Sequence, residues 1–173
     1  KGFCHMDLKL GNLVLGEGYL LKIIDFKCSI SPKYNKLIGR GTKNFRAPEI
    51  LTRCVVDPRA SDIYSAGIIL FALRNRMLPY IEDKRINGYN MLELMFNNPN
   101  AFWDLHNESQ DDIILCDEDF MKLFISMVKK HPAERATIAD IKKSKWYQGP
   151  VYSNTELKML FKEKLKIKST LKK

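Results

Sequence analysis

The spacing of apolar and polar residues changes along the chain, and these changes predict the order of its secondary structure. Two short apolar runs, "NLVL" and "YLLKIID", lie on either side of Gly16-Glu17-Gly18, which predicts a β-hairpin over residues 12–25. The stretch from Phe26 to Arg46 is rich in Ser, Pro, Gly, Lys, Asn and Arg and is typical of a loop. After Pro48 the apolar residues recur at helical spacing, so we expect the remainder to be mainly helical.

Three segments of the second part carry specific helix signals. Asp62 to Arg74 is apolar nearly all round, which is typical of a helix buried at the centre of a domain. "DEDFMKLFISMVKK" has apolar residues at helical spacing between an acidic start and a basic end. Thr137 and Asp140 have the spacing of a capping box. The stretch from Ile81 to Ile114 is mixed, with a clear break at "NNPN".

Composition indicates an ordinary globular domain. The 173 residues are 45% hydrophobic and 28% charged, enough for one compact domain with its own core. No signal-peptide pattern opens the chain, and the apolar run from Ile63 to Leu73 is interrupted and too short to span a bilayer. The cysteines are far apart and form no CxxC pair, which argues against a zinc site and a disulfide framework: Cys4, Cys28, Cys54 and Cys116. We therefore expect a soluble, cytoplasmic protein.

The formal net charge of +9 favours anionic partners, and much of the excess lies in the lysine-rich end after residue 157. The apolar residues of this end recur at helical spacing: Leu157, Leu160, Phe161 and Leu165. We expect a terminal helix packed on the body with its lysines outward. A nucleic-acid-binding domain is an alternative that rests on charge alone and predicts a steep fall of affinity with salt.

Residues able to carry chemistry lie close together in "HMDLKLGN", residues 5–12. Asp7, Lys9 and Asn12 share this loop, and "IIDF" places Asp25 at the end of the next strand. Phosphoryl transfer needs these types, because a carboxylate accepts the proton of the attacking hydroxyl, oxygen ligands hold Mg²⁺, and a cation neutralises charge on the moving phosphoryl group. An ordinary polar turn is the alternative reading of the loop.

Several motifs in order resemble those of the eukaryotic protein kinases. "HMDLKLGN" resembles the catalytic loop H-R-D-L-x-x-x-N, "DFK" falls where the family has D-F-G, and "APE" at residues 47–49 matches outright. "GTKNF" between them is similar to the substrate-docking turn of the family. "DIYSAGIILFAL" resembles the buried central helix of the larger lobe, and "HPAERATIADIKKSKW" resembles its closing segment. The resemblance covers roughly residues 3–148 and is nearest to the calcium/calmodulin-dependent kinase group.

The resemblance implies a role for each matched catalytic residue. Asp7 would be the catalytic base, Lys9 would contact the transferred phosphate of ATP, and Asn12 and Asp25 would bind Mg²⁺ and thereby the nucleotide. A lysine two residues after the aspartate, together with Thr42, implies serine or threonine of a protein as substrate.

It also implies structural roles. His5 and Asp62 would shape and hold the catalytic loop, and Glu49 and Arg135 would form a buried ion pair.

Two residues depart from the family pattern. Met6 replaces the arginine before the catalytic aspartate, which argues against control by phosphorylation of the activation loop, whereas Asp7 keeps catalysis open. Lys27 replaces the glycine of D-F-G, so a side chain restricts the backbone beside Asp25 and brings an ammonium group near the metal site. That ammonium would either oppose Mg²⁺ or substitute for part of its charge.

The sequence holds no G-x-G-x-x-G loop followed by a V-A-I-K strand, which are the ATP-holding parts of the smaller lobe. We therefore expect an α+β, protein-kinase-like fold consisting of the mainly helical C-terminal lobe with a short N-terminal β-hairpin. The expected domain spans residues 1–148, followed by a basic, helical extension over 149–173. Without the smaller lobe, the polypeptide is expected to bind ATP poorly. A pseudokinase or truncated lobe acting as a protein-binding module is the alternative to an active serine/threonine kinase.

Overall fold

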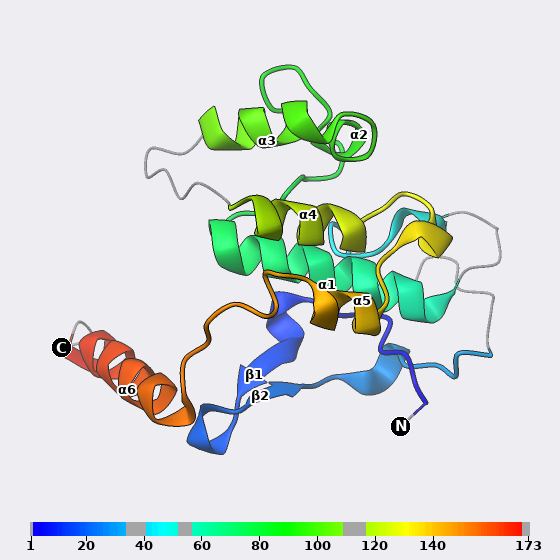
Figure 1. The fold of residues 1–173 in the computed structure, drawn as a ribbon. Helices are drawn as coiled ribbons and strands as arrows, with labels where there is room; N and C mark the ends of the chain where they lie inside the picture. The colour runs from blue at the N-terminus through cyan, green and yellow to red at the C-terminus, as the bar shows by residue number, and fades with distance from the viewer. Residues whose placement is uncertain (1, 34–40, 52–56, 109–116, 171–173) are drawn as a thin grey trace.

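The computed structural model describes residues 2–33, 41–51, 57–108 and 117–170. A two-stranded hairpin comes first, and helices make up most of the remaining chain (Figure 1). The long helix α1 and helix α4 lie side by side at the centre, with α2 and α3 on one side of them and the hairpin on the other (Figure 1). The expected order of a hairpin followed by a helical body is confirmed.

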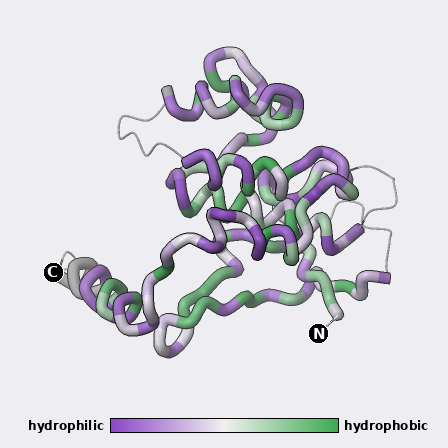
Figure 2. Tube along the Cα trace, in the orientation of Figure 1, coloured by the Kyte–Doolittle hydropathy of each residue, from purple (hydrophilic) through white to green (hydrophobic). Residues whose placement is uncertain are grey.

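The hairpin consists of β1 (Leu13–Leu15) and β2 (Leu21–Ile23), paired antiparallel with Leu13 opposite Ile23. A 3-10 turn over Glu17–Tyr19 joins them, and Gly18 adopts φ +68° there, a conformation that favours glycine. Both strands are mostly exposed. Apart from Lys22 their residues are apolar, and most of the hairpin tube is green in Figure 2. The predicted hairpin is confirmed, with shorter strands than the apolar runs suggest.

Helix α1 (Pro58–Asn75) forms the centre of the core. It begins four residues before the predicted start at Asp62, because the Asp57 carboxylate accepts the N–H of Arg59 and Pro58 has the fixed φ suited to the first turn. Tyr64, Ile68 and Phe71 are fully buried along the helix. The prediction of a central, buried helix is confirmed.

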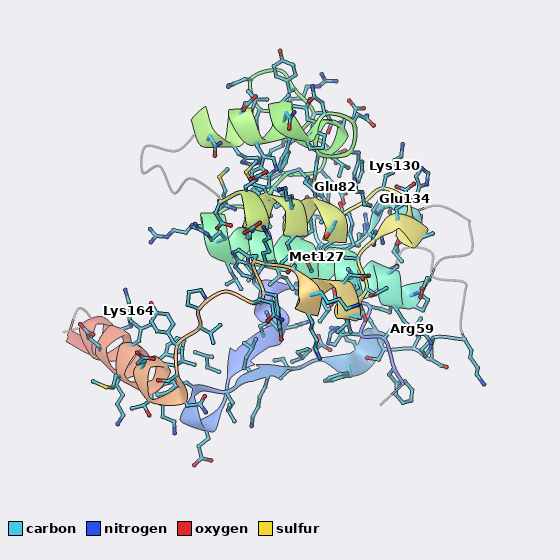
Figure 3. All side chains as sticks on the ribbon, in the orientation of Figure 1. Arg59, Glu82, Met127, Lys130, Glu134 and Lys164 are labelled. Atoms are coloured by element: carbon cyan, nitrogen blue, oxygen red, sulfur yellow. The ribbon has the colours of Figure 1, made fainter. Side chains whose placement is uncertain are left out.

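Helix α4 (Glu118–Met127) packs closely on α1 through a glycine. A Cβ atom on Gly67 would lie 2.8 Å from Cγ1 of Val128 and 3.1 Å from Cβ of Met127, so the two helices approach more closely there than a side chain on α1 permits. Met127 is labelled in Figure 3. The helix predicted in "DEDFMKLFISMVKK" is confirmed.

Two helices lie in the stretch 81–114, whose apolar pattern is mixed. This region contains α2 (Met91–Asn97) and α3 (Pro99–Glu108), and "NNPN" is the boundary between the two helices. The Asn98 side chain accepts the N–H of Ala101 at 3.3 Å and Pro99 begins α3, so the residues that break one helix start the next. Phe102 and Trp103 of α3 lie 5.9 and 5.6 Å from the ring of Phe71 on α1, which explains why this region belongs to the core.

Two further helices lie in the last part of the chain. Helix α5 (Ile138–Lys143) begins with the predicted capping box of Thr137 and Asp140, which is confirmed. Helix α6 (Asn154–Thr170) lies beside the hairpin turn, where the rings of Phe161 and Tyr19 stack at 5.2 Å. A terminal helix is present as expected, but its described residues pack on the hairpin turn and not on the helical body. Its described lysines are exposed, as expected: Lys158, Lys162 and Lys164. The side chain of Leu165 lies outside the described residues.

Other expectations concern thiols, metals and membranes. Cys4 and Cys28 form no disulfide within the described part of the chain, and Cys54 and Cys116 lie outside the described residues. Within the described ranges, no group of three or more His, Cys, Asp or Glu side chains is arranged to hold a metal ion. Among the described helices, none has the length and apolarity needed to cross a membrane.

Candidate functional site

The loop at residues 5–12 is fixed to helix α1 by one carboxylate. Asp62 accepts the backbone N–H of His5 at 2.6 Å and that of Met6 at 2.8 Å. Burial raises the pKa of Asp62 above its usual value, and the hydrogen bonds from Met6 and His5 oppose this shift. Both oxygens are used by the backbone, so Asp62 positions the loop.

His5 connects the same loop to the end of the hairpin. Its Nδ1 atom accepts the N–H of Asp7 at 3.2 Å, so the ring proton is on Nε2, which donates to the carbonyl oxygen of Ile24 at 2.9 Å. The imidazole also meets the ring of Phe26 edge-on at 4.9 Å. His5 thus holds Asp7 on one side and the residue before Asp25 on the other.

Asp7, Lys9 and Thr42 form a compact network. The Thr42 hydroxyl donates to Oδ1 of Asp7 at 2.6 Å and accepts from the Lys9 ammonium at 2.8 Å. Lys9 Nζ also lies 3.2 Å from Oδ2 of Asp7. Asp7 is only 6% exposed, whereas Lys9 is 29% exposed and can reach solvent. The structure therefore brings together three of the residues that the sequence proposes for the site.

Asn12 and Asp25 lie next to each other across the base of the hairpin. The Asn12 amide nitrogen donates to the carbonyl oxygen of Asp7 at 2.8 Å, which leaves its side-chain oxygen as an acceptor. Its backbone carbonyl accepts the N–H of Ile24 at 3.0 Å, directly before Asp25. Asn12, in the 3-10 turn Leu10–Asn12 before β1, and Asp25, two residues after β2, therefore place an amide oxygen and a carboxylate at the base of the hairpin.

Asp25 is held in an unusual backbone conformation and paired with Lys27. Its φ is +65°, in the left-handed region that a non-glycine residue adopts at an energetic cost. Lys27 Nζ lies 3.0 Å from Oδ2 of Asp25, with Lys27 71% and Asp25 31% exposed. A hydrogen bond from the Lys27 side chain, with smaller help from Lys9, holds the pKa of Asp25 below its usual value.

The two departures from the kinase pattern have different structural settings. Met6 has φ +64° and is buried in the core, where an arginine would place a charge among apolar neighbours. Lys27 lies within a short 3-10 helix, Phe26–Cys28, and has no positive φ. Its backbone therefore needs no glycine in this conformation, and its distinctive contribution to the site is the ammonium group.

Glu49 and Arg135 form a buried, two-pronged ion pair. Arg135 Nη1 lies 2.7 Å from Oε1 of Glu49, and Nη2 lies 2.7 Å from Oε2. Ser61 of α1 also donates to Glu49, at 2.9 Å, and the guanidinium lies 4.9 Å from the ring centre of Tyr64. The sequence does not predict the participation of Ser61 and Tyr64, because both appear there only as part of the central helix.

The site residues fit a divalent cation bound together with phosphate. Mg²⁺ in proteins is often held by one or two oxygen side chains, substrate phosphates and water. Asn12 and Asp25 supply two such oxygens, and the remaining ligands would come from nucleotide and solvent. This donor set suits the nucleotide-bound metal of phosphoryl-transfer sites and is too small to hold a metal by side chains alone.

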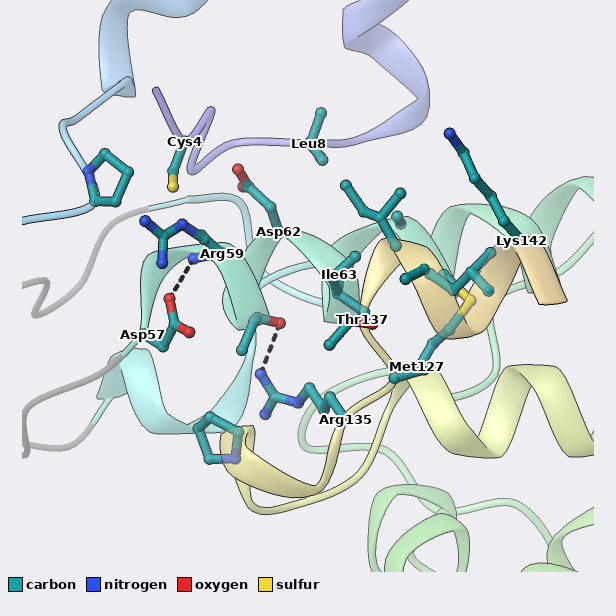
Figure 4. A pocket seen from close by; sticks show the side chains of 18 of the residues that line it. Cys4, Leu8, Asp57, Arg59, Asp62, Ile63, Met127, Arg135, Thr137 and Lys142 are labelled. Carbon is teal, nitrogen blue, oxygen red and sulfur yellow. Dashed lines mark hydrogen bonds between the residues drawn. The ribbon is translucent and has the colours of Figure 1, made fainter. Parts of the chain in front are cut away.

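A separate cavity of about 1050 Å³ lies between the segment Cys4–Leu8, helix α1 and helix α5 (Figure 4). Its lining is largely apolar and includes Ile63 and Met127. None of the described residues that line it is Asp7, Lys9, Asn12 or Asp25. Asp62 is part of its wall, so the cavity lies behind the anchor of the loop.

Comparison with known proteins decides the family. The chain matches the protein kinase domain over residues 1–147. The chain belongs to the protein kinase family. The two-stranded antiparallel sheet followed by helices fits a kinase-like fold. Members of this family use ATP and a divalent metal ion, so the protein kinase membership agrees with the oxygen donors of Asn12 and Asp25.

Relatives of this kinase-family chain include CBL-interacting protein kinases of Oryza sativa subsp. japonica and Arabidopsis thaliana. It is 32% identical over 162 residues to CBL-interacting protein kinase 31 of Oryza sativa subsp. japonica, covering 88% of this chain and 33% of the relative. It is 30% identical over 154 residues to CBL-interacting serine/threonine-protein kinase 13 of Arabidopsis thaliana, covering 86% of this chain and 28% of the relative. The chain therefore spans about a third of the length of these relatives.

Proposed function

We propose that this chain is the larger, C-terminal lobe of a serine/threonine protein kinase, which transfers the γ-phosphate of ATP to serine or threonine of a protein substrate. The observation that carries the proposal is the placement of Asp7. It is buried in a loop held by Asp62, with Lys9 at 3.2 Å, and Asn12 donates to its carbonyl. In an ordinary polar turn the aspartate would be exposed to solvent and would not be held by these contacts.

Each residue of the site has a chemical task in this proposal. The Asp7 carboxylate orients the substrate hydroxyl and accepts its proton, and the Lys9 ammonium neutralises charge on the transferred phosphoryl group. Asn12 and Asp25 hold Mg²⁺, which when bound supplies charge neutralisation between the phosphates. Thr42 joins Asp7 and Lys9, and its hydroxyl fixes their spacing.

The proposal also includes the domain bounds and the cellular compartment. We assign residues 1–148 to the kinase lobe and 149–173 to a basic helical extension. Cys4 is a buried thiol outside any disulfide, which suits a reducing compartment such as the cytoplasm.

A protein-binding module without catalysis is the second candidate. It is favoured by the exposed apolar hairpin, where Leu20 and Leu21 are 65% and 63% exposed, and by the ammonium of Lys27 on Asp25. Large exposed apolar patches commonly mark interaction sites. In this alternative the site residues keep the loop folded and the hairpin contacts a partner.

Binding of Mg·ATP separates the two candidates. The thermal midpoint of the chain is measured with and without Mg·ATP for the wild type, Asp25→Asn and Asp104→Asn. Asp104 is an exposed carboxylate on α3, so its variant matches the charge change away from the site. A shift that is lost in Asp25→Asn and kept in Asp104→Asn supports the kinase, and peptide phosphorylation lost in Asp7→Asn would then establish the reaction. Because the chain without the smaller lobe is expected to bind ATP poorly, the same measurement is made on a chain extended upstream, and the absence of a shift there favours the binding module.

A further inference from the structure

We propose that Lys27 is a tethered cation that competes with the divalent metal for Asp25, and so sets a weak metal affinity in this site. The inference rests on the proposed function, since it concerns the metal that Asn12 and Asp25 would hold. It assigns a role to the residue that departs from the kinase pattern. The role is electrostatic, because the backbone of Lys27 is unstrained.

Lys27 already contacts the Asp25 carboxylate, which is the group that would bind the metal. Lys27 Nζ lies 3.0 Å from Oδ2 of Asp25, so a metal that takes this oxygen must displace the ammonium. Lys27 is tied to the same short 3-10 helix that begins after Asp25, which keeps the ammonium at a high local concentration. A dissolved monovalent cation has no such advantage.

The charges of the site lead to the same conclusion. Asp7 and Asp25 carry two negative charges, and Lys9 and Lys27 carry two positive charges, so the four groups are formally neutral. Each lysine interacts electrostatically with Asp25, and Lys27 also interacts with Asp7. Without Lys27 the group has an excess negative charge, which attracts a divalent cation more strongly.

The competition is partial, because the pair is open to water. Lys27 is 71% exposed, and exposed ion pairs are weak and screened by salt. We therefore expect Lys27 to lower metal affinity several-fold and leave binding measurable. For the same reason, the difference between a variant without the ammonium and the wild type should shrink as the salt concentration rises.

The test is a titration with Mn²⁺, alone and with ADP, in which free Mn²⁺ is followed by electron paramagnetic resonance. Four proteins are compared with the wild type: Lys27→Met, Lys27→Arg, Lys33→Met and Asp25→Asn. Lys33 is an exposed lysine in the same loop, and its variant removes the same charge without touching Asp25. Lys27→Arg keeps a cation at position 27. Circular dichroism of each variant verifies that it folds.

We expect Lys27→Met to bind Mn²⁺ several-fold more tightly than the wild type, with Lys27→Arg and Lys33→Met close to the wild type and Asp25→Asn losing the site. Equal affinity of Lys27→Met and wild type, with loss in Asp25→Asn, would overturn the role of Lys27 and leave the proposed kinase site intact. The same gain in Lys33→Met would reduce the effect to net charge and also overturn it. Mn²⁺ binding in none of the proteins would overturn the inference, together with the metal-binding roles that the proposed function gives to Asn12 and Asp25.

Discussion

Arg135 holds Glu49 through two parallel hydrogen bonds of 2.7 Å, although the two residues are 86 positions apart in the chain. The arginine side chain is 1% exposed and the glutamate 9%, so water cannot replace either partner. Removing one member of such a pair leaves the other charge buried and unpaired, which typically costs ~3–5 kcal/mol.

We accordingly expect Arg135→Ala to lower the thermal midpoint by roughly 10 °C, at about 2–4 °C per kcal/mol for a chain of this size. Differential scanning calorimetry measures the change. Arg85→Ala is the control, because Arg85 is exposed and its Nη1 atom donates to the Gly88 carbonyl, three residues away on the surface. A midpoint of Arg135→Ala close to that of Arg85→Ala would contradict the prediction.

A second prediction concerns Asp62, the anchor of the loop at residues 5–12. Asp62→Ala removes the acceptor of the His5 and Met6 N–H groups, and each buried donor left unpaired costs about 1–3 kcal/mol. Hydrogen exchange of these two amides should become faster by more than the global loss of stability explains. Asp57→Ala, which removes the cap of α1, is the control and should lower stability while leaving the relative protection of the two amides unchanged.

The third prediction is a pH dependence from His106. Its imidazole is buried against Phe71 and Phe102, and its Nε2 atom pairs with the Pro79 carbonyl oxygen at 2.8 Å. Burial lowers the pKa of His106 below its usual 6.5, and the hydrogen bond to Pro79 partly opposes the shift. The folded state therefore prefers the neutral ring, so this stabilising contribution is complete above pH 6.5 and is lost as the pH falls toward and through the lower folded-state pKa.

Urea unfolding between pH 7 and pH 5 measures that dependence. His106→Gln keeps a donor for Pro79 and should flatten the fall in the free energy of unfolding. His131→Gln changes an exposed histidine and should leave the slope of the wild type. If both variants had the slope of the wild type, His106 would not be its source.

The fourth prediction concerns the C-terminal helix. The Phe161 ring stacks on Tyr19 at 5.2 Å with an angle of 19° between the planes. Aromatic pairs of this kind contribute about 0.5–1.5 kcal/mol beyond their buried area. Phe161→Ala should therefore raise hydrogen exchange throughout α6. Met159→Ala, at a position that is 66% exposed, should have little effect.

The sequence predicts the elements that have strong local signals. The hairpin around Gly18, the buried helix containing Tyr64 and the capping box at Thr137 are all present in the structure. The bounds of helices α2 and α3 are not predicted within the expected helical body, because "NNPN" contains residues that end helices and equally residues that begin them. Asn90 and Asn98, each accepting N–H groups at the start of a helix, are the signals that indicate them.

The candidate site likewise contains residues that the sequence predicts and interactions that it does not predict. Asp7, Lys9 and Asn12 can be grouped from the sequence because they share one short loop with a recognisable spacing. The sequence does not predict that Lys27 pairs with Asp25. The direction in which this exposed lysine side chain extends depends on the conformation of the turn after Asp25. The hydrogen bond from Ser61 to Glu49 depends on how α1 lies against a segment 12 residues earlier, which no local pattern describes.

The bond between Asp62 and His5 also has a consequence for synthesis on the ribosome. Asp62 comes 57 residues after His5, so the catalytic loop leaves the ribosome well before its anchor exists. At about 5–20 residues per second, this interval lasts roughly 3–11 s. During that time the hairpin has no central helix beneath it and its apolar strands are open to chaperones. The geometry around Asp7 is therefore a late event in the folding of the nascent chain, completed only when α1 docks.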